Sequence, residues 1–162
     1  MTITDSSLEQ LAHRVGQYLL LNNKKLCTAE SCTGGWVAKC CTDIAGSSGW
    51  FERGFITYSN DSKHDLLDVS DTTLEQHGAV SEETVIEMAR GALNNSKADI
   101  SIATTGIAGP DGGSESKPVG TVWFGLASST VTKSKVHYFS GDRDAIRRQA
   151  VMVALQFLIE KT

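Results

Sequence analysis

The residues best suited to chemistry are a serine, a lysine and a tyrosine that follow two short apolar stretches. Ser31 lies within Thr28–Gly35, a segment that carries a carboxylate, hydroxyls, a thiol and a pair of glycines. A serine hydroxyl is a weak nucleophile until an adjacent base takes its proton. Lys63 is a candidate base because burial lowers the pKa of a lysine, and Tyr58 is a candidate proton relay or second base. Residues of these types would suit acyl transfer by a serine.

Each of these residues also has a simpler explanation. Ser31 or Thr33 would serve equally well as the N-cap of a helix that begins near Gly34. Lys63 would then be a solvated helix lysine, and Tyr58 a half-buried aromatic residue at a strand end. Neither a GxSxG nor an SxxK motif surrounds Ser31, so local motifs do not decide between the two interpretations.

Two segments are candidates for binding a developing oxyanion. The first is the turn Thr33, Gly34 and Gly35, where a helix N-terminus would present main-chain N–H groups. The second is formed by Thr105 and Gly106, which open a glycine-rich loop. Preorganised N–H donors of this kind stabilise the tetrahedral intermediate of acyl transfer. The glycine loop contains no GxxxxGK[ST] motif, so it is not a P-loop.

The hydrophobic pattern predicts alternating helices and strands that would position these residues. Apolar residues recur at helical spacing up to about Leu21, with Ser6 or Ser7 as the cap, and Asn60 or Asp61 is expected to cap a short helix. The other expected elements are strands over 25–29, 51–58, 99–104, 119–127 and 134–139, helices over 34–42 and 81–94, a short helical piece after 68–73, and a last helix opened by Asp142.

This order predicts an α/β fold, a three-layer α/β/α sandwich with a mixed, mostly parallel sheet, as one domain over residues 1–162. The last two strands are joined by a short turn and should pair antiparallel. Three polar loops, 31–35, 58–63 and 105–113, each follow a strand directly. If those strands are parallel neighbours, the loops meet at the carboxyl edge of the sheet, where ligands bind in such folds.

Composition excludes several classes of protein. The chain has 162 residues, 15 Lys and Arg against 19 Asp and Glu, and a net charge of −4, with no basic run. Nucleic acid is therefore not expected as a partner. No apolar run approaches the length of a membrane span and the N-terminus lacks the pattern of a signal peptide, so a cytoplasmic protein with no membrane partner is expected.

Four cysteines, Cys27, Cys32, Cys40 and Cys41, lie close together without a CxxC pair or a nearby histidine at zinc-binding spacing. We expect them to be small buried residues, and we expect no metal site.

Six stretches match one known family in order and spacing. They are TAESCTGG at 28–35, GFITYSN at 54–60 followed by Lys63, HGAVS at 77–81, GIAGPDGG at 106–113, KPVGTVWFG at 117–125 and FSGDRDAIRRQA at 139–150. Together they closely resemble the CinA C-terminal-domain family in its stand-alone bacterial form. The likeness extends from about Ser7 to Lys161. It implies an α/β/α sandwich that hydrolyses the carboxamide of nicotinamide mononucleotide, commonly as a homo-oligomer and without a cofactor or metal.

The resemblance also implies roles for particular residues. Ser31 would be the acyl-accepting nucleophile, with Tyr58 and Lys63 as its activating partners. The turn at 33–35 and the glycine loop from Gly106 would form the substrate pocket.

Asn60, Gly109 and Arg147 complete the expected substrate-binding set. Whether Lys117, Arg143 or Arg147 holds the substrate phosphate stays open, as does the choice of base between Lys63 and Tyr58. Two other functions also remain. The chain would otherwise be a non-catalytic nucleotide-binding or regulatory module, or an interaction domain left from a longer fusion.

Overall fold

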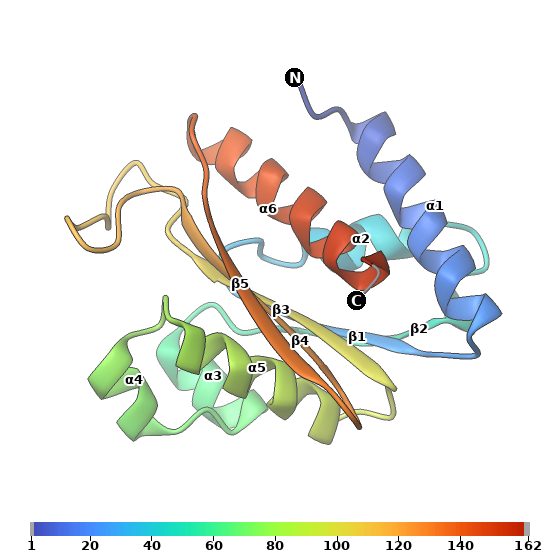
Figure 1. Cartoon of the computed structure of the whole chain (residues 1–162), viewed down its shortest axis with the longest axis horizontal. Coiled ribbons are helices and arrows are strands. Elements are labelled where there is room, and N and C mark those ends of the chain that lie inside the picture. The colour runs from blue at the N-terminus through green and yellow to red at the C-terminus, as the bar shows by residue number, and fades with distance from the viewer. Residues whose placement is uncertain (1, 161–162) are drawn as a thin grey trace.

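A computed structural model describes residues 2–160, so Lys161 lies outside the described part. Figure 1 shows a twisted sheet between two helical layers, with α1, α2 and α6 on one face and α3, α4 and α5 on the other. This confirms the predicted three-layer α/β/α sandwich. The elements are α1 (Asp5–Leu21), β1 (Leu26–Glu30), α2 (Trp36–Thr42), the short η1 (Ser47–Gly49), β2 (Phe51–Ile56), α3 (Asn60–Leu67), α4 (Asp71–His77), α5 (Glu82–Asn94), β3 (Ile100–Gly106), β4 (Thr121–Ser128), β5 (Thr132–Tyr138) and α6 (Arg143–Ile159).

The sheet is mixed, with the strand order β2-β1-β3-β4-β5. β1 pairs parallel with β2 and with β3, whereas β4 pairs antiparallel with β3 and with β5. The predicted closing hairpin is therefore confirmed. Since β2, β1 and β3 are parallel neighbours, the loops that follow them begin at the same edge of the sheet. The loop that carries Ser31 is the middle one of the three.

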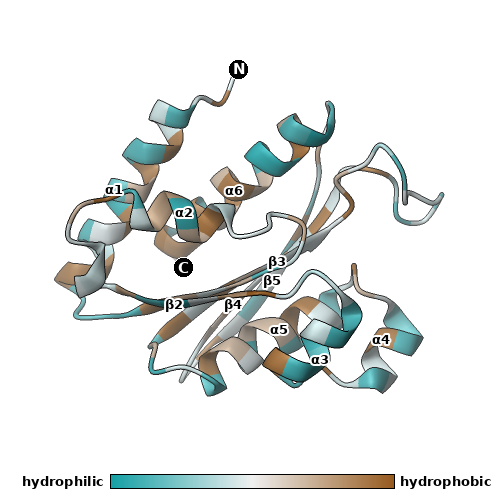
Figure 2. Cartoon of the chain, turned by 180° about the vertical axis from the view of Figure 1, so that it is seen from behind, coloured by the Kyte–Doolittle hydropathy of each residue, from teal (hydrophilic) through white to brown (hydrophobic). Residues whose placement is uncertain are grey.

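Two apolar clusters hold the layers together. The larger one packs α1, α2 and α6 on the sheet and includes Trp50, Phe124 and Leu155, all almost fully buried. The smaller one packs α5 on the opposite face around Met88. In Figure 2 the first turns of α6 are teal and its later turns, which pack in the larger cluster, are mostly brown. In the part of the chain that the structure describes, no helix combines the length and hydropathy needed to span a membrane.

The caps of α1 and α3 differ from the prediction. Asp142 caps α6 as expected, and Ser81, where the helix over 81–94 was expected to begin, is the cap of α5. Thr4 caps α1, where Ser6 or Ser7 was expected, and Ser59 caps α3, where Asn60 or Asp61 was expected. Thr4 and Ser59 have extended backbones, and each side chain accepts an N–H from three residues ahead. A residue that caps a helix through its side chain has a non-helical backbone, whereas the expected residues lie inside the helices.

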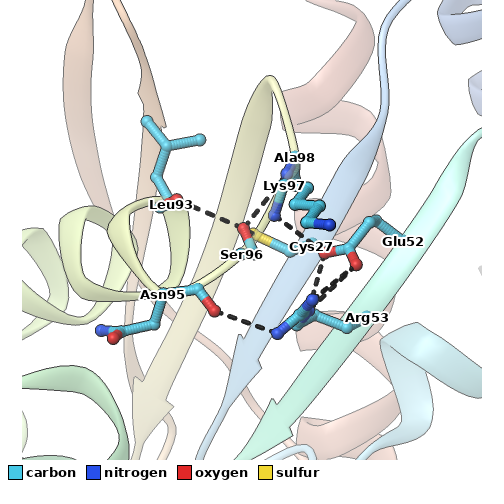
Figure 3. A network of polar contacts seen from close by, with 8 residues as sticks. All are labelled: Cys27, Glu52, Arg53, Leu93, Asn95, Ser96, Lys97 and Ala98. Atoms are coloured by element: carbon cyan, nitrogen blue, oxygen red, sulfur yellow. Dashed lines mark hydrogen bonds and ion pairs between the residues drawn. The ribbon is translucent and has the colours of Figure 1, made fainter.

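A polar network closes the sheet at the edge opposite Ser31 (Figure 3). The side chain of Arg53 forms an ion pair with Glu52 and donates to the carbonyl of Asn95 at 3.2 Å. The amide of Lys97 donates to Glu52 at 3.2 Å, and the Ser96 hydroxyl donates to the Cys27 sulfur at 3.4 Å. These contacts tie the loop between α5 and β3 to β1 and β2. They fix the end of the parallel strands that lies opposite the Ser31 loop.

Substituting Gly91 with alanine tests how α3 is held. A Cβ at Gly91 would overlap the main-chain carbonyl of Leu67 at the end of α3, and backbone does not move out of the way as a side chain does. We expect Gly91→Ala to lower the free energy of unfolding by about 3 kcal/mol, the upper part of the range for overpacking. Urea unfolding measures it. Gly49→Ala, whose Cβ would meet only the Leu20 side chain at 3.5 Å, is the control. Equal losses in both variants would contradict the close approach.

Candidate active site

Ser31 directly follows β1 and is almost fully buried. Its main-chain N–H donates to the carbonyl of Thr104 at 3.0 Å, which extends the pairing of β1 and β3 by one residue. The backbone that carries the hydroxyl is therefore fixed by the sheet.

Lys63 reaches this hydroxyl from α3. Its Nζ lies 3.0 Å from Ser31 Oγ, 2.9 Å from the carbonyl of Thr57 and 3.2 Å from the carbonyl of Tyr58. The lysine is 1% exposed, so the alternative of a solvated helix lysine is wrong. Burial lowers its pKa to about 8, because an ammonium loses hydration when it leaves water.

The three neighbours fix the orientation of the amine. A carbonyl oxygen can only accept, so the contacts to Thr57 and Tyr58 each use an N–H of Lys63. When the amine is neutral it has two N–H groups, and its lone pair then faces the hydroxyl of Ser31. The geometry is that of a base set to accept the serine proton.

The expected role of Tyr58 as a proton relay requires its hydroxyl to lie next to Ser31 or Lys63, and the structure places that hydroxyl elsewhere in the site. Its side chain is 61% exposed, not half buried, and its hydroxyl accepts from Nη2 of Arg143 at 3.1 Å. Among residues 2–160, the tyrosine hydroxyl makes no hydrogen bond to Ser31 or Lys63. Only the main-chain carbonyl of Tyr58 contacts the amine. The geometry therefore favours Lys63 over Tyr58 as the base.

A cavity of about 170 Å³ opens in front of Ser31. Five of the expected site residues line it, namely Ser31, Tyr58, Lys63, Thr105 and Gly106. Arg143, one of the three candidates for holding the substrate phosphate, also lines it. Four more lining residues were not expected by number, namely Cys32, Ala79, Val80 and Ala108. The hydroxyl of Thr105 donates to the carbonyl of Ala79 at 2.8 Å and thereby holds the 77–81 segment against the cavity.

The other expected residues do not line this cavity. Thr33, Gly34, Gly35 and Arg147 surround a separate hollow on the far side of the turn. Asn60 is exposed at the start of α3.

Gly109 contributes through its backbone, whose carbonyl accepts from Nη1 of Arg143 at 2.7 Å. Arg147 donates Nε to the carbonyl of Cys32 at 3.0 Å and Nη2 to that of Thr33 at 3.1 Å, so it holds the turn in place.

The sequence interpretation missed Glu30, which orders this turn. Its carboxylate is 1% exposed and accepts from the Thr33 hydroxyl at 2.7 Å, the Val37 amide at 2.8 Å and the Ala38 amide at 3.0 Å. Burial raises the pKa of Glu30, and these hydrogen bonds oppose that change. The carboxyl group thus satisfies the first amides of α2.

Glu30 also corrects the expected cap. The residue at the N-cap of α2 is Gly35, with φ of 97°, and neither Ser31 nor Thr33 caps the helix. The Thr33 hydroxyl lies 2.8 Å from that of Thr104 instead. Because the Val37 and Ala38 amides are taken by Glu30, they are not free to bind an oxyanion.

The cysteines are buried and free, as predicted. Burial raises the pKa of Cys32 to about 12, so this thiol next to Ser31 stays protonated and is a poor nucleophile. In residues 2–160, no group of three or more His, Cys, Asp or Glu side chains is placed to hold a metal ion.

Comparison with known proteins gives consistent matches. A family model described as the CinA C-terminal domain matches residues 8–162. The chain is 59% identical over 159 residues to the nicotinamide-nucleotide amidohydrolase PncC of Escherichia coli, covering 96% of this chain and 95% of that protein. It is 48% identical over 150 residues to the protein of the same name from Pseudomonas putida, covering 93% and 94%.

Solved structures agree with the fold. The competence/damage inducible protein CihA from Agrobacterium tumefaciens superposes with a TM-score of 0.92 at 43% identity, covering 98% of this chain and 96% of that chain. The competence damage-inducible protein A from Klebsiella pneumoniae superposes with a TM-score of 0.90 at 39% identity, covering 93% and 94%.

Removing the Glu30 carboxylate should loosen the turn that carries Ser31. Glu30→Ala leaves buried amides of α2 and the Thr33 hydroxyl without their acceptor, and we expect a loss of about 3 kcal/mol in unfolding free energy. Glu30→Gln keeps a neutral acceptor and should lose less. Urea unfolding at neutral pH measures both, with the exposed Glu75→Ala as control. A loss in Glu30→Ala no larger than that of the control would show that the carboxylate does not hold the turn.

Proposed function

This chain belongs to the CinA C-terminal-domain family, and we propose on that basis that it hydrolyses the carboxamide of nicotinamide mononucleotide to nicotinic acid mononucleotide and ammonia. Relatives named for this activity match the chain over nearly their whole length. The observation that carries the proposal is the 3.0 Å contact between Lys63 Nζ and Ser31 Oγ at a cavity. The product, nicotinic acid mononucleotide, is still a nucleotide, which is consistent with a role in recycling pyridine nucleotides.

The reaction begins with proton transfer from Ser31 to Lys63. The neutral amine takes the hydroxyl proton while Oγ forms a bond to the carboxamide carbon, and the carbonyl oxygen takes up the negative charge. Lys63 is then an ammonium. It donates hydrogen bonds to the carbonyls of Thr57 and Tyr58, which stabilise its charge.

The developing oxyanion needs donors close to Ser31. The main-chain N–H of Cys32, the residue after the nucleophile, makes no hydrogen bond within residues 2–160. We assign it as one oxyanion donor, in place of the α2 amides that Glu30 occupies. The backbone of Gly106, which lines the same cavity, is placed to support the other side of the substrate.

The remaining steps reuse the same amine. Collapse of the tetrahedral intermediate breaks the carbon–nitrogen bond as Lys63 returns its proton to the leaving group, which departs as ammonia. Water then attacks the acyl-serine while Lys63 removes its proton. Breaking the ester releases the acid and restores the Ser31 hydroxyl. Glu30 and Arg147 hold the turn throughout and do not exchange protons with the substrate.

A non-catalytic nucleotide-binding module is the alternative, and Lys63 argues against it. Burying a lysine away from any carboxylate costs stability. The described residues include no ion-pair partner for Lys63, and its one side-chain contact is the serine hydroxyl. A module that only binds a phosphate has no use for a desolvated amine in that position.

Substituting Ser31 with alanine tests the nucleophile. Removing Oγ leaves nothing to form the acyl-enzyme, so we expect ammonia release from nicotinamide mononucleotide to fall by at least about 1,000-fold. Cys32→Ala should stay within about threefold of the original rate, because the thiol is protonated. Circular dichroism checks that both variants fold. Activity near the original level in folded Ser31→Ala would exclude Ser31 as the nucleophile.

The pH profile tests the base. Only the neutral amine of Lys63 accepts a proton, and its share grows as pH rises. We therefore expect kcat/KM to increase with pH and to level off above a midpoint of about 8, the lowered pKa of Lys63. Ammonia release measured from pH 6.5 to 9.5, about 1.5 units on either side, covers the transition. A flat profile, or one that falls as pH rises, would contradict a neutral lysine base.

A further inference from the structure

The size of the cavity divides a nucleotide substrate into two parts. Its volume of about 170 Å³ is enough for one carboxamide-bearing ring, whereas pockets that enclose a whole drug-sized ligand hold about 300–1,000 Å³. With the carboxamide at the buried Ser31, the ribose and phosphate must extend towards the exposed mouth. The groups at the mouth therefore decide how the phosphate is held.

Three basic side chains were candidates for this role, and their positions separate them. Lys117 donates to the carbonyl of His77 at 2.6 Å and does not line the cavity. Arg147 lines the hollow behind the turn and is bound to main-chain carbonyls there. Arg143 lines the cavity itself, beside Tyr58.

The charge of Arg143 is not neutralised by a neighbour. Its guanidinium donates to two uncharged acceptors, the Gly109 carbonyl at 2.7 Å and the Tyr58 hydroxyl at 3.1 Å. Within residues 2–160, no carboxylate lies within ion-pair distance of it. The adjacent Asp142 instead accepts the Ala145 amide as the cap of α6. A planar guanidinium in this state has both charge and donors to offer a dianion.

We propose that Arg143 is the specificity-determining residue that binds the substrate phosphate, with Tyr58 as its partner. This inference rests on the proposed function. The guanidinium exchanges neutral acceptors for phosphate oxygens and forms the shorter, stronger hydrogen bonds of a charged pair. The Tyr58 hydroxyl accepts from Arg143, so its own proton is left to donate to the same phosphate. Tyr58 thus acts at the phosphate end and not at the serine.

The proposal separates recognition from chemistry. Lys63 and Ser31 act on the carboxamide whether or not a phosphate is present, whereas Arg143 contacts only the phosphate. Loss of Arg143 should therefore affect a nucleotide and not the matching nucleoside.

The experiment compares two substrates in four proteins. Ammonia release from nicotinamide mononucleotide and from nicotinamide riboside, which lacks the phosphate, gives kcat and KM for the unaltered chain, Arg143→Ala, Arg143→Lys and Arg90→Ala. Arg90 is an exposed arginine on α5 that contacts Thr132 at 3.3 Å, away from the cavity, and serves as the matched control. Inhibition by nicotinic acid mononucleotide and by nicotinic acid riboside gives a second measure if the riboside reacts too slowly to follow.

We expect Arg143→Ala to lower kcat/KM for the nucleotide by about 10- to 100-fold, mainly through KM, as for the loss of a charged hydrogen bond. Values for the riboside should stay within about threefold. Arg143→Lys should recover part of the loss, because a lysine keeps the charge but not the paired donors. Added salt should raise KM for the nucleotide in the unaltered chain more than in Arg143→Ala.

Two results would overturn the proposal while leaving the proposed function in place. One is an unchanged nucleotide preference in Arg143→Ala. The other is an equal loss on both substrates, which would mean that Arg143 acts by positioning Tyr58 and Gly109. If the unaltered chain releases no ammonia from the nucleotide, the proposed function fails and this inference fails with it.

Discussion

A buried carboxylate organises the turn that carries Ser31. Glu30 ends β1, the central strand of the parallel region, and its oxygens satisfy the first amides of α2 and the hydroxyl of Thr33. The residue between this carboxylate and the turn is Ser31, so the proposed nucleophile is carried on a backbone that is fixed on both sides. Arg147 completes the arrangement by holding the carbonyls of the same turn. Helix α2 does not use the Ser31 side chain as its N-cap, so the Ser31 hydroxyl is left to contact Lys63.

The hydrophobic pattern was sufficient for the fold and for the convergence of the loops. Apolar runs such as 25–29 and 99–104 predicted strands separated by helices, and this order alone implied parallel pairing and a common edge. That is why Ser31, Lys63 and Thr105 were predicted together, and the structure places all of them at one cavity. Strand ends were less predictable. The strand expected to reach Tyr58 ends at Ile56, because the next carbonyls turn towards Lys63.

The parts that were missed depend on side-chain direction, which residue type does not encode. Glu30 looked like one polar residue in a polar segment, and only its burial shows that it accepts the α2 amides. Thr33 and Gly35 follow Ser31 closely, yet the chain turns here, with the Gly34 amide donating to the Ser31 carbonyl at 3.1 Å, and both residues line the separate hollow. Arg143 and Arg147 are four residues apart and lie on the same side of α6, so the step of about 6 Å along the helix axis places one at the cavity and the other at the hollow. The signal available in the sequence was a glutamate directly after an apolar strand and directly before a candidate nucleophile.

The burial of the thiols has a consequence for covalent inhibitors. Cys32 is adjacent to the proposed nucleophile, but its sulfur is buried and its pKa is raised by burial, as for the three other cysteines. Maleimides, iodoacetamide and mild oxidants attack thiolates and have none to attack here. Boronic acids and carbamates, which react with an activated hydroxyl, suit a serine whose neighbour is an amine. Chemical probes of this cavity should therefore be chosen to react with a serine hydroxyl and not with a thiol.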